Sequence, residues 1–196
     1  MLIKSLKSAV KAVVSPIVDA TGYYARRIAT ATAAPGGWTV VMYHRVIEDQ
    51  ALDPFGLGMC VERGRFEQQV RYFKSNFSVI AVGEVVRRMD AGEPLPDRAL
   101  SVTFDDGYLD NLTTALPILK SHGLPFTVYV PTGGLEAGEM LWWDRAIGAM
   151  ACTDRQELDL ASVGLSNVEE RCSLAGLARG TTVDRVLDLL WSLDHG

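Results

Sequence analysis

The sequence predicts an α/β fold in which strands and helices alternate along the chain and the strands pair in parallel. Short apolar runs, of the kind found in strands buried on both faces, alternate with stretches in which apolar residues recur every three or four positions. Right-handed crossovers then lead to either an open doubly wound sheet or a barrel. The 196 residues, 48% of them hydrophobic, are enough to bury a substantial core.

The first strand is expected at residues 38–43, where the run WTVVMY should be buried on both faces. Further strands are expected at residues 79–82, 100–104 and 126–130. The helices between the strands are expected at residues 65–77, 84–91 and 110–122. Leu112, Leu116 and Leu119 should share the apolar face of the last of these helices, and Gly123 should cap its C-terminus.

The final third of the chain has a mostly helical pattern. We expect a helix at residues 142–150, a short strand at 157–163, and a final helix with Leu187 and Trp191 in its apolar stripe. Thr181 and Asp184 have the spacing of a capping box before that helix. The chain therefore divides into an N-terminal segment, a main domain and a helical continuation, at residues 1–37, 38–145 and 146–196.

Residues 1–20 predict a basic amphipathic helix, which a linker at residues 31–37 connects to the main domain. This helix either packs on the domain through its apolar stripe or makes a peripheral contact with an anionic membrane surface. Lys11 and Pro16 interrupt its apolar run, so it does not form a convincing secretory signal. It also lacks the roughly 20 apolar residues that a membrane-spanning helix needs.

Charge and cysteine content exclude several classes of protein. The net charge is −5, and the chain beyond the N-terminal segment is acidic, so it lacks the clustered Lys and Arg of a nucleic-acid binder. Cys60, Cys152 and Cys172 are far apart in the sequence and have no metal-ligand spacing. We therefore expect buried free thiols and no partner nucleic acid.

Polar residues gather where the expected strands end, which is where parallel α/β folds bind ligands. His44 follows the first strand, and Asp105 and Asp106 follow the strand at 100–104. Adjacent carboxylates repel each other, and a divalent metal is a natural compensator. One carboxylate could bind the metal while the other takes a proton from a water molecule, which would give hydrolysis. The alternative is a solvated turn or a helix N-cap.

The segment TFDDGYLDN at residues 103–111 resembles the first motif of the NodB-type polysaccharide deacetylases, carbohydrate esterase family 4. VMYHRV at 41–46, residues 117–130 and LWWD at 141–144 resemble further segments of that family, so the resemblance covers about residues 38–145. It implies a distorted parallel (β/α) barrel and metal-dependent removal of acetyl groups from a polysaccharide. Asp105 then matches the general base, Asp106 a ligand of a divalent metal, foremost zinc, and His44 a histidine near the site.

The sequence also departs from the family, because the H-x-x-x-H motif that supplies the other metal ligands is missing. The only histidines are His44, His122 and His195. We therefore expect a partial barrel, an N-terminal fragment of a longer deacetylase that holds its metal weakly or not at all. The family resemblance suggests the cell envelope, whereas the lack of a convincing signal leaves a cytoplasmic or membrane-peripheral location open.

The alternative function is a non-catalytic carbohydrate-binding or assembly module with a degenerate deacetylase fold. Trp142 and Trp143 could then stack on sugar rings, as they could in a deacetylase, although core packing is the other interpretation of this pair.

Overall fold

The computed structural model describes residues 37–49, 53, 55, 59–133, 138, 140–163, 171–176 and 178–193. The expected N-terminal helix, its membrane contact and His195 lie outside the described residues. The chain forms two compact units, one from residues 1–42, 67–104 and 116–128 and the other from residues 43–66, 105–115 and 129–196. The division expected from the sequence, at residues 37 and 145, stays a prediction.

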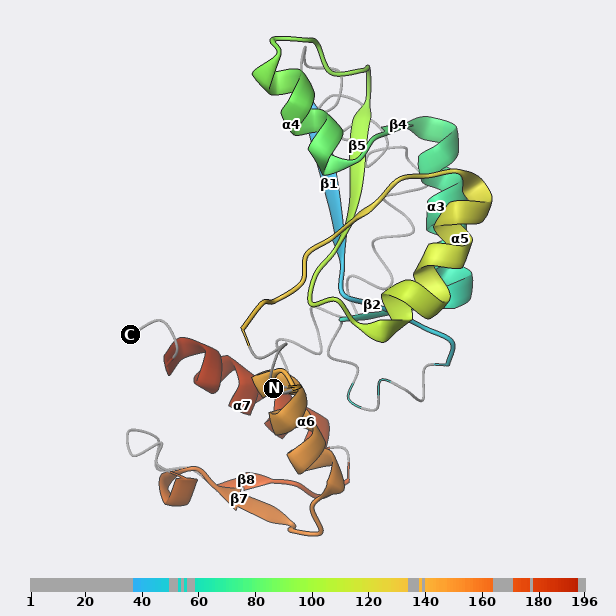
Figure 1. Ribbon diagram of the computed structural model, residues 1–196. Helices are drawn as coiled ribbons and strands as arrows, with labels where there is room; N and C mark the ends of the chain where they lie inside the picture. The colour runs from blue at the N-terminus through green and yellow to red at the C-terminus, as the bar shows by residue number, and fades with distance from the viewer. Residues whose placement is uncertain are drawn as a thin grey trace, which may run out of the picture. The chain divides into compact units, whose positions relative to one another are not determined.

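The first unit contains a sheet centred on strand β5 (Ala99–Phe104). Strand β1 (Trp38–Tyr43) lies beside β5, as Figure 1 shows. The short strands β4 (Ser78–Val79) and β6 (Thr127–Val128) both pair with β5 in parallel, near its beginning and its end respectively. The predicted α/β fold with parallel pairing is therefore confirmed.

The two long strands differ in burial. Every residue of β5 is buried, as its apolar run predicts. In β1, however, Trp38, Val40 and Met42 are 37%, 47% and 53% exposed, so the prediction of a strand buried on both faces is wrong. Successive side chains of a strand point to opposite faces, and a strand that is covered on one face exposes alternate residues.

Helices α3 (Arg63–Asn76), α4 (Val82–Asp90) and α5 (Leu116–His122) follow the predicted order. In α3 the side chains of Phe66, Val70 and Phe73 are buried, as the helical spacing predicts. The Nζ of Lys74 donates a hydrogen bond of 2.8 Å to the carbonyl of His122, which ties α3 to the end of α5.

A π-helical segment, η2 (Asn111–Ala115), precedes α5 and changes which side chains face the core. Leu119 is buried and Leu116 half-buried, as predicted, but Leu112 is 61% exposed, so the predicted apolar face is wrong at its first residue. A π turn holds about one residue more than an α turn, which shifts the helical phase by about 100°. The predicted cap is confirmed, because Gly123 ends the helix with φ +68° and donates its N–H to the carbonyl of Lys120.

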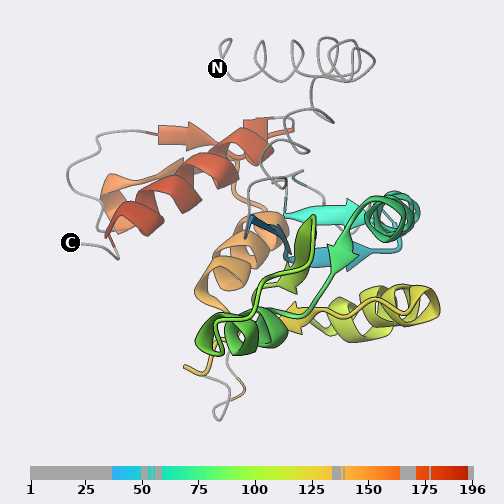
Figure 2. The ribbon, with the colours of Figure 1, turned by 90° about the horizontal axis from the view of Figure 1, so that it is seen from above.

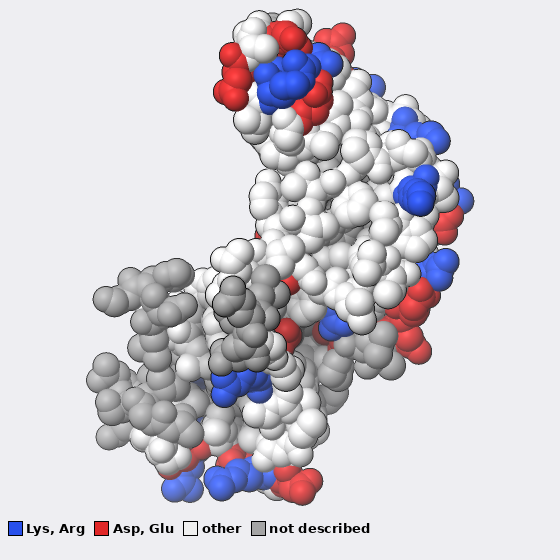
Figure 3. Space-filling view, in the orientation of Figure 1, with Lys and Arg blue, Asp and Glu red and all other residues white. Residues whose placement is uncertain are grey.

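Charged side chains of both signs surround α4 (Figure 3). Glu84 accepts hydrogen bonds from Arg87 at 2.9 Å and from Arg88 at 2.7 Å, and Arg87 also pairs with Glu93 at 2.9 Å. Hydrogen bonds from Arg87 and then Arg88 lower the pKa of Glu84 from 4.5 to about 2. The helix thus presents a solvated network of ion pairs rather than a patch of one sign.

The second unit contains two short strand pairs that the sequence did not predict as pairs. Strand β2 (Arg45–Ile47) pairs in parallel with β3 (Cys60–Glu62), and β7 (Glu157–Asp159) pairs with β8 (Arg171–Ser173) in antiparallel fashion. The strand expected at residues 157–163 is therefore shorter, and a 3-10 turn follows it at Ala161–Val163.

Helices α6 (Trp142–Cys152) and α7 (Ala178–Leu193) belong to the same unit, and α7 runs along the β7–β8 hairpin in both Figure 1 and Figure 2. Their shared core contains the following buried side chains: Met150, Leu160, Cys172, Val183 and Val186. The predicted capping box at Thr181 is wrong, because α7 already begins at Ala178. The hydroxyl of the next residue, Thr182, donates to the carbonyl of Ser173 at 2.6 Å and so ties α7 to β8.

Cys60, Cys152 and Cys172 are free thiols, as expected, but only Cys172 is buried. The expected burial is wrong for Cys152, which is exposed, and for Cys60, which is half-buried. Among the described residues, no helix is long and apolar enough to cross a membrane.

Candidate functional site

The turn after β5 carries the paired carboxylates in a constrained backbone conformation. Asp106 and Gly107 have φ values of +69° and +64°, and the left-handed region is costly for aspartate by about 1 kcal/mol. A Cβ on Gly107 would lie 3.2 Å from both methyl groups of Val130, so glycine fits this position in space as well as in conformation. The N–H of Asp105 donates to the carbonyl of Tyr43 at 2.9 Å, which fixes the start of the turn.

Asp110 links this turn to β2. Its carboxylate accepts a hydrogen bond from Nε of Arg45 at 2.8 Å and one from the N–H of Val46 at 3.1 Å. The side chains of Asp110 and Arg45 are 14% and 31% exposed. The guanidinium of Arg45 also lies 5.1 Å from the ring centroid of Tyr108, within the range of a cation–π contact. One ion pair therefore positions β2, which follows directly after His44, against the segment that follows Asp106.

Tyr108 connects the turn to α6 through its hydroxyl. The hydroxyl accepts a hydrogen bond from Nε1 of Trp143 at 2.9 Å and donates to Asp144 at 3.1 Å. Burial raises the pKa of Tyr108, so the hydroxyl remains a donor at neutral pH. This pair of bonds sets the orientation of the Trp143 ring.

Asn111 is the first residue of η2 and is 4% exposed. Neither side-chain polar atom of Asn111 has a hydrogen-bond partner. A buried unpaired amide is destabilising by about 1–3 kcal/mol. The same turn of π helix therefore combines two features that are unfavourable for stability and are frequent near functional sites.

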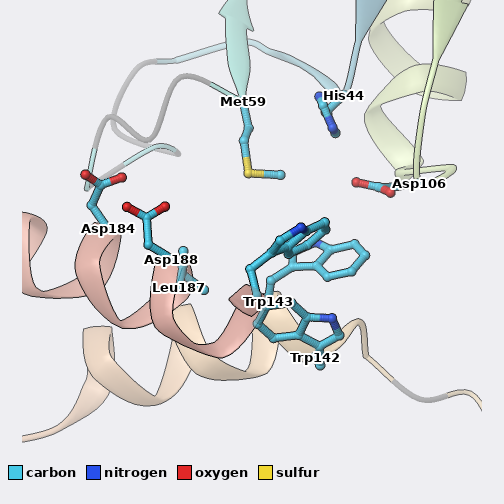
Figure 4. A pocket seen from close by; sticks show the side chains of 9 residues that line it. His44, Met59, Asp106, Trp142, Trp143, Asp184, Leu187 and Asp188 are labelled. Carbon is cyan, nitrogen blue, oxygen red and sulfur yellow. The ribbon is translucent and has the colours of Figure 1, made fainter. Parts of the chain in front are cut away.

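A cavity of about 240 Å³ brings several of the predicted site residues together. His44 and Asp106 lie on one side of it, and Trp142 and Trp143 form its floor in the view of Figure 4. Burial raises the pKa of the Asp106 carboxyl, the nearby His44 opposes this rise, and the carboxylates of Asp105 and Asp144 add to it. The arrangement places an imidazole and a half-buried carboxyl at the edge of an aromatic surface.

The aromatic surface is made by three indoles from two helices. The ring centroid of Trp142 lies 5.4 Å from that of Trp143 and 5.4 Å from that of Trp191. The ring centroids of Trp143 and Trp191 are 6.0 Å apart. Trp142 and Trp143 are half-buried, and Trp191 is 53% exposed. Neither interpretation of the Trp pair holds alone, because the rings pack on one another and also line the cavity.

A second cavity of about 220 Å³ lies on another side of Asp106 and includes Tyr108 and Asp144 in its lining. Asp106 therefore borders both cavities, whereas Asp105 borders neither of the two.

The sequence did not identify Asp110, Asp144 or Trp191 as members of this region. Asp110 lies inside the TFDDGYLDN segment and directly before η2, which was the signal that could have singled it out. Trp191 belongs to an apolar stripe that predicts core packing, and only its tertiary position shows that it also faces a cavity.

The donor set of the site can be compared with that of a metal centre. A catalytic zinc site takes three protein ligands and leaves one position open. Among the residues that the structure describes, no three His, Cys, Asp or Glu side chains are placed to share a cation. The described side chains therefore do not by themselves build the metal centre that the resemblance implies.

Comparison with known proteins finds a similarity that includes this turn. The sequence pattern of the polysaccharide deacetylase family matches residues 92–151. This part of the chain is therefore similar to the polysaccharide deacetylases. The poly-β-1,6-N-acetyl-D-glucosamine N-deacetylase of Escherichia coli K12 is 31% identical over 98 residues, which cover 50% of this chain and 14% of that relative.

Two solved deacetylase structures are also similar to the chain. The Streptococcus pyogenes deacetylase PplD, in complex with acetate, has a TM-score of 0.47 and 27% identity, covering 54% of this chain and 47% of that one. IcaB from Ammonifex degensii has a TM-score of 0.45 and 26% identity, covering 60% of this chain and 49% of that one. The deacetylase-family segment contains Asp105, Asp106 and both tryptophans of α6, whereas His44 and α7 lie outside it.

Proposed function

We propose that the chain is part of a hydrolase that removes N-acetyl groups from a polysaccharide. The observation that carries this proposal is the position of the family segment's Asp106 beside His44 in a cavity with an aromatic floor. Indole surfaces suit the apolar faces of sugar rings, and a half-buried carboxyl beside an imidazole suits proton transfer. The name of the E. coli relative supports an N-acetylglucosamine polymer as the substrate class.

Within this proposal the paired carboxylates have different roles. Asp105 would accept the proton of the attacking water, and Asp106 would be one ligand of a divalent metal, foremost zinc, which would make that water more acidic. His44 contributes to the same site, and Trp142 and Trp143 contact the sugar. The parallel sheet around β5 is then part of a (β/α) barrel of the NodB type. The family resemblance supports these assignments, and the proximity of His44 to Asp106 is consistent with them.

The test is acetate release from a β-1,6-linked N-acetylglucosamine oligomer, measured with and without added Zn²⁺. Asp105→Asn should lower the rate by at least about 100-fold, the usual contribution of a general base. Asp106→Asn should also lower the rate, because it removes a carboxylate ligand of the metal. Asp154→Asn removes the same charge from an exposed position outside both cavities and should leave the rate unchanged. Equal rates for all of these proteins would refute the assignment of the carboxylates.

A second candidate function is a carbohydrate-binding module without catalysis. The lack of a three-ligand cluster among the described residues favours it, together with the indole-lined cavity. The module would bind the oligomer in the presence of a chelator and release no acetate under any metal condition. Release of acetate that requires Asp106 would exclude it.

A further inference from the structure

Tyr108 connects the linings of the two cavities that Asp106 borders. It lines the cavity of about 220 Å³, whereas Trp143 lines the cavity of about 240 Å³. The hydrogen bond of 2.9 Å from Nε1 of Trp143 to the hydroxyl of Tyr108 therefore joins one lining to the other. In the view of Figure 4 the indole of Trp143 lies below His44 and Asp106. The side chain that Tyr108 holds thus faces the predicted reactive residues.

The hydroxyl of Tyr108 is engaged within the protein both as acceptor and as donor. It accepts the N–H of Trp143 and donates its own proton to Oδ1 of Asp144 at 3.1 Å. The N–H is the only polar group of an indole, so Trp143 has no donor left for a sugar hydroxyl. Trp143 then offers only its ring face, which suits the apolar face of a sugar ring.

The ring of Tyr108 is itself held from another side. The guanidinium of Arg45 lies 5.1 Å from the ring centroid, and Arg45 pairs with Asp110 at 2.8 Å. The preceding backbone is constrained by the left-handed conformation of Asp106 and Gly107. An indole that donates to a hydroxyl fixed in this way loses freedom to rotate, because its N–H must point at the oxygen atom.

We propose that Tyr108 is a positioning residue, which holds the face of the Trp143 indole toward the sugar beside Asp106. This inference rests on the proposed function and deepens it, because it names the residue that keeps the sugar-contacting surface in register with the carboxylate turn. Tyr108 acts through Trp143 and does not itself contact the sugar. At this position the polymer is recognised by the apolar face of its ring.

Binding of a β-1,6-linked N-acetylglucosamine tetramer tests this role, in the presence of a chelator so that no turnover occurs. Tyr108→Phe keeps the ring beside Arg45 and removes only the hydroxyl. It should weaken binding about threefold to tenfold, as expected when one neutral hydrogen bond no longer holds the contacting ring. The matched control is Tyr72→Phe, on α3 and outside both cavities, which should leave the affinity unchanged.

A double-mutant cycle separates positioning from a general loss of stability. Trp143→Phe keeps an aromatic ring and has no N–H, so adding Tyr108→Phe to it should not weaken binding further. A merely structural role of Tyr108 would weaken binding by the same factor in both backgrounds. Urea unfolding curves give the folded fraction of each variant under the conditions of the titration.

Two further readouts report on the position of the indole. The indole N–H resonance of Trp143, identified by its absence in Trp143→Phe, should shift in Tyr108→Phe and stay in place in Tyr72→Phe. In the acetate-release assay, Tyr108→Phe should raise KM by about the same factor as the loss of affinity. It should change kcat by less than about twofold, because the lost contact serves ground state and transition state alike.

The inference is overturned if Tyr108→Phe leaves the affinity as it is, or if it weakens binding equally with and without the Trp143 indole. It is also overturned if the wild-type chain does not bind the tetramer. Failure of the proposed hydrolase is distinguishable from these outcomes. Acetate release that requires Asp105, with unchanged binding in Tyr108→Phe, would retain the hydrolase and refute the role of Tyr108. Coupled binding without acetate release would do the reverse.

Discussion

Replacing Asp110 by asparagine should reveal how strongly the segment after the carboxylate turn is held to β2. The substitution keeps an oxygen that can accept the N–H of Val46 and removes the charge that pairs with Arg45 at 2.8 Å. A hydrogen bond between charged groups contributes about 1.5–3 kcal/mol when it is buried. Arg45 is 31% exposed, so solvent screening reduces this figure, and we expect a loss of about 1–2 kcal/mol in the free energy of unfolding.

The measurement is urea unfolding followed by far-UV circular dichroism. The matched control is Glu48→Gln, which breaks an ion pair of 2.9 Å with Arg63 where both side chains are 53% exposed. Because exposed pairs contribute little, this control should change the free energy of unfolding by at most about 0.5 kcal/mol. A double-mutant cycle of Asp110→Asn with Arg45→Gln should give a coupling of about 1 kcal/mol or more.

The reasoning would be refuted by a cycle in which the two single effects simply add. It would equally be refuted if Asp110→Asn had no larger effect than Glu48→Gln. Asp110→Ala should be less stable than Asp110→Asn by about 1 kcal/mol, because the N–H of Val46 then loses its acceptor.

Three further predictions concern the same fold. Gly107→Ala should destabilise the chain by at least about 1 kcal/mol in thermal unfolding, because Gly107 has a φ of +64° and the side chain of Val130 lies close to it. As a control, Gly148→Ala should stabilise the chain by about 0.5–1 kcal/mol, because Gly148 lies inside α6 and an added Cβ would meet nothing within 4 Å. Tyr108→Phe leaves the N–H of Trp143 without its acceptor and should cost about 1–2 kcal/mol, with a changed near-UV circular dichroism signal; an unchanged signal would contradict the described bond. Glu84 has a pKa lowered from 4.5 to about 2, so its ion pairs stabilise the folded state above pH 4.5 and this contribution is lost as the pH falls toward 2. Glu84→Gln should flatten the acid side of a plot of melting temperature against pH, and an identical acid slope in the two proteins would count against it.

The sequence predicted the elements whose signal is long and local. The apolar run of β5 and the spacing of Phe66, Val70 and Phe73 each extend over a full strand or helix, so both elements are found where they were expected. Strands β2, β3 and β8 have three residues each, which is too short for a period of two to stand out. Strand β7 has the same length and lies within the longer strand expected at residues 157–163.

Burial and the composition of the site depend on neighbours that the sequence does not name. Trp38, Val40 and Met42 of β1 are exposed although all three side chains are apolar. His44 and Asp106 could be placed at strand ends by the rule for parallel sheets, and the cavity contains both of them. The part of the cavity lined by Asp184 and Asp188 could not be predicted, because it depends on how α7 packs within its unit.

The π-helical segment at Asn111–Ala115 has a consequence for how this region tolerates the loss of one residue. A helix whose two ends are both fixed by packing can accommodate one additional residue only by widening a turn. Removing Thr113 should let an ordinary α turn close while α5 keeps its contacts. The shortened chain should melt at a higher temperature, and the unpaired side-chain amide of Asn111 should leave its present position. Thermal stability would then increase at the expense of the local arrangement beside the candidate site.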